Sequence, residues 1–215
     1  MTENLFEANY DLTKKSKFRK FYDSNKIYII SSVIILVVSF ISFNFYLEYK
    51  KDKKILLSEN YIKAKIYLEA NDKQKATDIL KNIIEANEST YSTLSLFLII
   101  NQNLIKDKKE ISILFDNLIK NSNFPDEITN LLIYKKALFQ SNFVEESKFL
   151  ESTKLLINSE SKWKPHALLL LGDYFVSKKE YIKAIEFYQE IFTIKNLDQN
   201  IYNHARSQLK IISDE

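Results

Sequence analysis

His166 and His204 are the only histidines of the chain, and imidazole is the side chain best suited to proton transfer near neutral pH or to metal binding. Each histidine precedes or enters an alanine-containing helical segment, and neither has a carboxylate at metal-site spacing in the sequence. No serine or threonine lies in a nucleophile elbow, and a single glycine cannot build a phosphate-binding loop. The chain has no cysteine, which excludes disulfides and thiolate metal ligands. The sequence therefore predicts no enzyme, no metal and no other cofactor.

Acidic residues and net charge add no catalytic or nucleic-acid signal. The pairs Asp126-Glu127 and Glu145-Glu146 are adjacent in sequence, so their side chains point to different faces of a helix and are expected to be solvated. The net charge of +3 is too small to indicate a nucleic-acid partner. We expect no nucleic-acid partner and no small-molecule substrate, which leaves binding of other proteins.

The longest uncharged run of the chain is residues 27–47, which Lys26 and Glu48 bound. As a helix it would reach roughly 30 Å, the thickness of the hydrocarbon core of a bilayer. Tyr28 and Tyr46 lie near its two ends, where aromatic rings favour the headgroup level. Residues 27–47 are therefore predicted to be a single transmembrane helix, and the alternative is a buried core helix.

The apolar run divides the chain into three parts. Residues 1–26 form an N-terminal tail, residues 27–47 the membrane span, and residues 48–215 a domain large enough for a core of its own. A cleaved signal peptide is not expected, because the run is too long for its apolar region and no small-residue cleavage site follows. The lipid bilayer is therefore a predicted partner of the chain.

Basic residues flank both ends of the span, so the positive-inside rule gives nearly equal support to the two orientations. The tail carries Lys14, Lys15, Lys17, Arg19, Lys20 and Lys26. The other flank carries Lys50, Lys51, Lys53, Lys54, Lys63 and Lys65. Long domains cross membranes largely regardless of charge, which lowers the weight of the second group. The sequence favours a cytoplasmic N-terminus.

Residues beyond the span show the pattern of helical hairpins. This part holds one glycine and two prolines, so helices joined by short polar turns are expected. Apolar-periodic segments of about 13–16 residues alternate with such turns, which is typical of αα-hairpins. Pro125 and Pro165 stand where a first helical turn should begin, and residues 200–213 are expected to form a helix that caps the last hairpin.

The hairpins align with one another when Ala64, Ile99, Tyr134 and Gly172 are taken as equivalent. Twelve residues later come Ala76, Ile111, Glu146 and Ala184; sixteen later, Leu80, Phe115, Leu150 and Tyr188; nineteen later, Ile83, Leu118, Thr153 and Ile191. Intervals of 35, 35 and 38 residues with this order are typical of tetratricopeptide repeats. The predicted fold is all-α: one transmembrane helix, then a tetratricopeptide-like solenoid with a C-terminal capping helix.

In tetratricopeptide geometry, the positions three before and one after each anchor line the concave face. These positions are Tyr61, Lys65, Leu96, Ile100, Leu131, Lys135, Leu169 and Asp173. Only the two lysines suit the basic clamp with which cochaperone repeats hold acidic peptide tails. The leucine, isoleucine and tyrosine residues instead suggest a groove for an apolar or extended segment of another protein. Alternatively, several of these side chains pack against neighbouring helices.

Three further motifs accompany this organisation: Phe6-Glu7 to Lys14-Lys15, the aromatic-basic cluster Phe18 to Tyr22, and Trp163-Lys164-Pro165 before the last repeat. In this order the chain resembles the tetratricopeptide-like ancillary subunits of the bacterial Sec translocon, in their alphaproteobacterial form. The resemblance implies an inner-membrane protein with a cytoplasmic N-terminus and periplasmic repeats. It also implies a helper role in which the repeats contact translocon subunits, translocating nascent chains or periplasmic chaperones.

A second hypothesis keeps the anchor and reverses the side of the repeats. The chain would then be a cytoplasm-facing, membrane-tethered assembly factor for secretion or cell-division machinery, with residues 50–54 against anionic lipid. The side of the membrane that the repeats face separates the two hypotheses.

Overall fold

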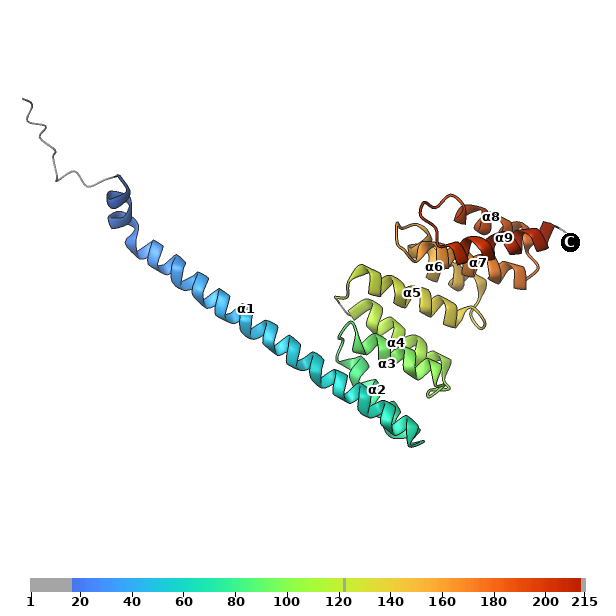
Figure 1. Ribbon diagram of the computed structural model, residues 1–215, viewed down its shortest axis with the longest axis horizontal. Helices are drawn as coiled ribbons and strands as arrows, with labels where there is room; N and C mark the ends of the chain where they lie inside the picture. Colours follow the sequence, from blue (N-terminus) through green and yellow to red (C-terminus); the bar gives the residue numbers. More distant parts are fainter. Residues whose placement is uncertain (1–16, 122, 214–215) are drawn as a thin grey trace, which may run out of the picture. The chain divides into compact units, whose positions relative to one another are not determined.

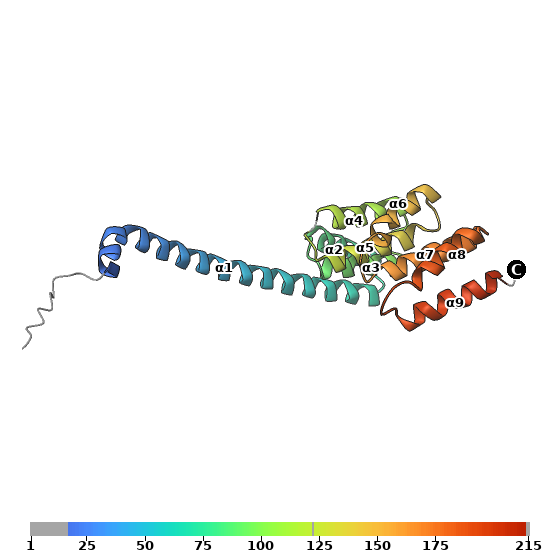
Figure 2. The same cartoon turned by 90° about the horizontal axis from the view of Figure 1, so that it is seen from above.

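The computed structural model describes residues 17–121 and 123–213, and the regular structure of these residues is helical (Figures 1 and 2). The helices are α1 (Lys17–Glu69), α2 (Lys73–Glu85), α3 (Tyr91–Asn101), α4 (Lys108–Asn121), α5 (Asp126–Gln140), α6 (Glu146–Ile157), α7 (Lys164–Ser177), α8 (Tyr181–Ile191) and α9 (Gln199–Ser213). The all-α prediction is confirmed. The chain divides into two compact units between Lys53 and Lys54. The motif from Phe6 to Lys15 lies outside the described residues.

The first unit contains the apolar part of α1. Among the described residues, α1 is the one helix long and apolar enough to cross a membrane, and no part of its most apolar stretch is buried in the protein. Large apolar side chains are exposed along it, from Ile27 to Leu47. A core helix would be covered by other elements, and the described residues do not cover this stretch, which favours the membrane prediction. This segment could be a single membrane span.

The second unit is a series of stacked hairpins, in which each helix from α2 to α9 packs against the next one along the chain (Figure 1). The C-terminal part of α1, residues 54–69, belongs to this unit, and its Leu57 and Ala64 lie in the same core as Leu80 and Ile83 of α2. A second core follows, from Ala137 in α5 to Ile212 in α9. The protein interior is thus built hairpin by hairpin, which is the solenoid that the sequence predicts.

Burial confirms the predicted register of the first, second and fourth repeats and corrects the register of the third. The anchors Ala64, Ile99 and Gly172 are buried, whereas Tyr134 is only partly buried. The residues that match the pattern of the other repeats are Ala137, Phe149, Thr153 and Leu156, each with 0% exposure. The third repeat is therefore shifted by three residues from the predicted Tyr134, Glu146, Leu150 and Thr153. The longest interval, of 38 residues, therefore lies before the third anchor rather than before the fourth. The intervals between successive anchors are 35, 38 and 35 residues.

Asparagine replaces glycine where the helices end. Asn71, Asn87, Asn103 and Asn196 have positive φ angles of 61°, 50°, 49° and 55°. The first three lie two residues after the last residues of α1, α2 and α3, where a left-handed residue lets the chain leave the helix. Asparagine is one of the few residues that adopts this conformation at low cost. A chain with one glycine can therefore make tight turns between its hairpins.

Lys179 ends α7 in the same way, with φ of 62°. Its N–H donates to the Val176 carbonyl and the Glu180 N–H to the Phe175 carbonyl, both at 2.9 Å, which is a Schellman motif. Lys179→Gly should stabilise the domain by about 1 kcal/mol, because lysine is strained in this conformation and glycine is not. The neighbouring Lys178 has φ of −89°, so Lys178→Gly should not stabilise. Denaturant unfolding of both variants tests the expectation, and equal effects would contradict it.

The predicted capping helix is present as α9. Asp198 begins it by accepting a hydrogen bond from the Asn200 N–H at 2.8 Å. Ile201, Ala205 and Ile212 are buried on one side of the helix, which packs against both α7 and α8. The apolar end of the last hairpin is thereby covered.

Candidate protein-binding site

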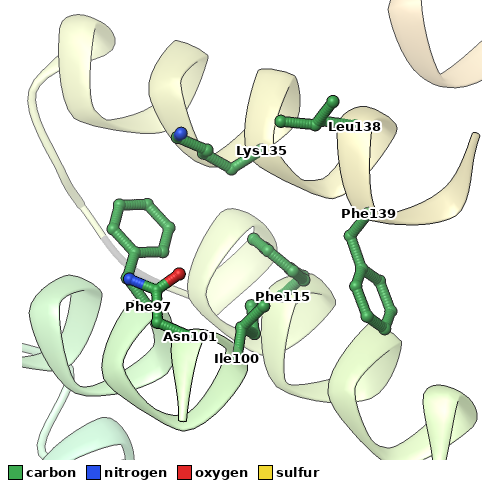
Figure 3. A pocket seen from close by; sticks show the side chains of 7 residues that line it. All are labelled: Phe97, Ile100, Asn101, Phe115, Lys135, Leu138 and Phe139. Atoms are coloured by element: carbon green, nitrogen blue, oxygen red, sulfur yellow. The ribbon is translucent and has the colours of Figure 1, made fainter. Parts of the chain in front are cut away.

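A pocket of about 190 Å³ lies where α3, α4 and α5 meet. Its lining is Phe97, Ile100, Asn101, Phe115, Lys135, Leu138 and Phe139. Figure 3 shows Lys135 and Leu138 of α5 on one side and the α3 residues on the other, with Phe115 of α4 between them. Phe115 is fully buried, so it gives the pocket a fixed apolar floor.

The lining of this pocket is mostly apolar, with two polar side chains. Five of the lining side chains are hydrocarbon, and Lys135 is the one charged group among them. Asn101 adds an amide that can donate to and accept from a peptide backbone. A bulky apolar side chain fits such a space, and the Lys135 ammonium group can bind a nearby carboxylate or carbonyl oxygen.

Two of the eight residues predicted for the concave face, Ile100 and Lys135, line this pocket together. Lys65 is exposed, and Leu131 is partly buried. Tyr61 and Leu169 are partly buried against the first and second cores. The prediction that Leu96 is exposed is wrong: the side chain has 0% exposure and packs inside the first core. It faces inward because α3 packs against both α2 and α4.

The corrected register of the third repeat explains why Tyr134 and Leu138 were not predicted for the concave face. With Ala137 as the anchor, the positions three before and one after are Tyr134 and Leu138 rather than Leu131 and Lys135. Leu138 lines the pocket and is 40% exposed. Tyr134 stacks on Trp163, with ring centroids 5.5 Å apart, and burial raises the pKa of its hydroxyl. Phe97 and Asn101 had no signal in the repeat pattern, because they lie one residue beyond the aligned positions.

Asp173, another residue predicted for the concave face, makes contacts within the domain at its surface. Its Oδ1 accepts a 2.7 Å hydrogen bond from the Tyr188 hydroxyl and lies 3.0 Å from Nε2 of His204. Burial raises the pKa of Tyr188 far above its usual value, and the bond to Asp173 adds to this. The carboxylate therefore joins α7, α8 and α9. These contacts tie the capping helix α9 to the last hairpin, while the Asp173 side chain stays 42% exposed.

Metal ligands are not clustered in the part of the chain that the structure describes. Within residues 17–121 and 123–213, no three His, Asp or Glu side chains come close enough to hold an ion. His166 instead lies against Trp163 and Tyr134, with centroid distances of 5.1 and 5.6 Å. That arrangement is an aromatic contact between α5 and the start of α7.

Stacked helical hairpins with a hollow between successive helices define a helical-repeat protein of the kind that binds other proteins. The chain belongs to the tetratricopeptide repeat-like domain family, which matches residues 19–213. Members of this family are typically non-catalytic scaffolds for protein–protein interactions. No curated protein and no solved structure matches the chain.

Proposed function

We propose that the protein is a non-catalytic, membrane-anchored scaffold that binds a segment of another protein in the pocket between α3, α4 and α5. The observation that carries the proposal is the pocket itself, in which one lysine and one asparagine accompany five apolar side chains. A helical groove of this kind recognises a peptide through an apolar anchor residue and a few polar contacts. The exposed apolar part of α1 supports attachment to a bilayer.

The more specific proposal is a periplasmic helper of the Sec translocon in the bacterial inner membrane. It rests on the resemblance of the sequence motifs and on the membership of the repeat-like family. The N-terminus would lie in the cytoplasm and the repeats in the periplasm. The bound segment would belong to a translocon subunit, a periplasmic chaperone or a translocating chain.

Protease digestion of intact and lysed spheroplasts tests the side of the membrane. The proposal predicts that the repeats are digested in intact spheroplasts. Protection until lysis would place them in the cytoplasm and favour the second hypothesis, the membrane-tethered assembly factor. That hypothesis draws on the four lysines at residues 50–54, which suit a cytoplasmic leaflet rich in anionic lipid.

Binding at the pocket is tested by Lys135→Glu/Leu138→Asp. These changes reverse the one charge of the lining and place a carboxylate in its apolar part, so co-purification of the translocon subunits with the full chain should fall about tenfold. The matched control is Lys109→Glu/Ile113→Asp on α4, because Lys109 and Ile113 are exposed and do not line the pocket. Unchanged recovery with the pocket variant, or an equal loss with the control, would contradict the assignment.

A further inference from the structure

A second cavity, of about 790 Å³, lies at one end of the last hairpin and shares no lining residue with the pocket between α3, α4 and α5. A short turn joins α7 to α8, so the start of α7 lies beside the end of α8, where the Lys164 ammonium group is 3.1 Å from Oε1 of Glu190. The connection from α6 to α7 and the connection from α8 to α9 both line the cavity. Its volume is within the range of small-molecule sites, about 300–1,000 Å³.

One wall of this cavity is apolar. Ile194 and Leu197 of the α8–α9 connection are partly buried against the second core, and Ile201 at the start of α9 is 6% exposed. Pro165 at the start of α7 adds a further apolar ring to the lining. Because the packing of the last hairpin holds these side chains, the apolar wall is present before any ligand binds.

Two of the charged groups in the lining already have partners within the fold. Lys164 is paired with Glu190. Asp198 accepts a 2.8 Å hydrogen bond from the Asn200 N–H at the start of α9. These two charges therefore stabilise the ends of the helices.

The other charged groups of the lining are Lys162, Lys195 and Glu160, and all three are exposed. Among the described residues, no carboxylate pairs with either lysine. Two ammonium groups against one carboxylate leave a net charge of +1 on the groups that the fold does not use. His166 also lines the cavity, and its Nδ1 is buried without a hydrogen-bond partner in the described part of the chain.

We propose that this cavity binds a small organic carboxylate, with the charged group beside Lys162 and Lys195 and the apolar body against Ile194, Leu197 and Ile201. A net charge of +1 matches a monoanion better than a doubly charged phosphate, and lysine binds carboxylates through charge-assisted hydrogen bonds. The apolar wall favours a ligand with a hydrocarbon body over an inorganic ion.

This site goes beyond the proposed protein-binding function and does not depend on it. The repeat pattern did not predict a small-molecule site, because Lys162 and Lys195 are 33 positions apart and belong to different connections. Only the stacking of the last hairpin brings the two connections to one cavity.

The test exposes the full chain, reconstituted in lipid vesicles, to 4-benzoylbenzoate, an aromatic carboxylate that reacts with nearby C–H groups under near-ultraviolet light. Proteolysis and mass spectrometry should locate the adducts in residues 160–166 and 193–201, which line the cavity. The neutral probe 4-benzoylbenzamide has nearly the same shape. It should label these residues about tenfold less, because a hydrogen bond between charged groups contributes roughly that factor.

Lys162→Gln/Lys195→Gln should lower labelling by 4-benzoylbenzoate to the level of the neutral probe. Both side chains are exposed, so the variant should keep its fold. The matched control, Lys63→Gln/Lys109→Gln, removes the same charge from exposed positions outside the cavity and should be labelled like the wild type. Equal labelling of the Lys162/Lys195 variant and the wild type, equal labelling by the two probes, or adducts only outside residues 160–166 and 193–201 would overturn the inference.

Discussion

Gly172→Leu should lower the free energy of unfolding of the repeat domain by about 3 kcal/mol, the upper end of the usual cost of overpacking. Even a single added carbon at Gly172 would lie 2.7 Å from Cδ1 and Cζ of the Tyr188 ring. That ring cannot move aside easily, since Tyr188 has 0% exposure and its hydroxyl is bonded to Asp173. The crossing of α7 and α8 therefore requires a residue without a side chain.

Fluorescence of Trp163, the single tryptophan, follows denaturant unfolding of the repeats without a contribution from the apolar part of α1. Ser177→Leu at the exposed end of α7 is the control and should change stability little. Combining Gly172→Leu with Tyr188→Ala should cost less than the sum of the two single changes, because the smaller residue leaves room for leucine. Additive effects would show that the two residues do not share this crossing.

Leu36→Arg/Val37→Arg should prevent stable membrane insertion. Both positions are at the centre of residues 27–47, where each arginine costs about 2.5–3.5 kcal/mol of insertion free energy. The wild-type chain should resist extraction by alkaline carbonate, whereas the variant should appear in the supernatant.

The control for this experiment is Ile113→Arg/Leu155→Arg, which adds the same charge at exposed apolar positions of α4 and α6. It should stay with the membrane. If the variant with arginine at residues 36 and 37 also resists extraction, then residues 27–47 are not the span.

The sequence predicts the hairpins well because local rules determine them. The small residues Ala64, Ala76, Gly172 and Ala184 are all buried, and they determine where two helices can approach closely. The prediction places the longer interval of 38 residues before the fourth repeat instead of the third, although Ala137 offers the same kind of small residue three positions after Tyr134. The repeat pattern alone does not show which connection between helices is the longer one.

The candidate site was less predictable than the fold. Ile100 and Lys135 were expected on a binding face, but the pocket also needs Phe115, which is fifteen residues or more from either of them in sequence. Pairing of Asp173 with His204 likewise joins residues 31 positions apart. Such contacts depend on how hairpins stack, and the sequence of one hairpin does not contain that information.

Site-specific photocrosslinking in living cells tests the central claim, that the pocket binds another protein. The crosslinking residue replaces Asn101 or Leu138 in the pocket, and Ile182 on α8 is the control, since its side chain is 78% exposed. Defined adducts with translocon subunits or periplasmic chaperones from both pocket positions, and none from Ile182, are the expected result. No adduct from the pocket positions, or the same adducts from Ile182, would contradict the claim.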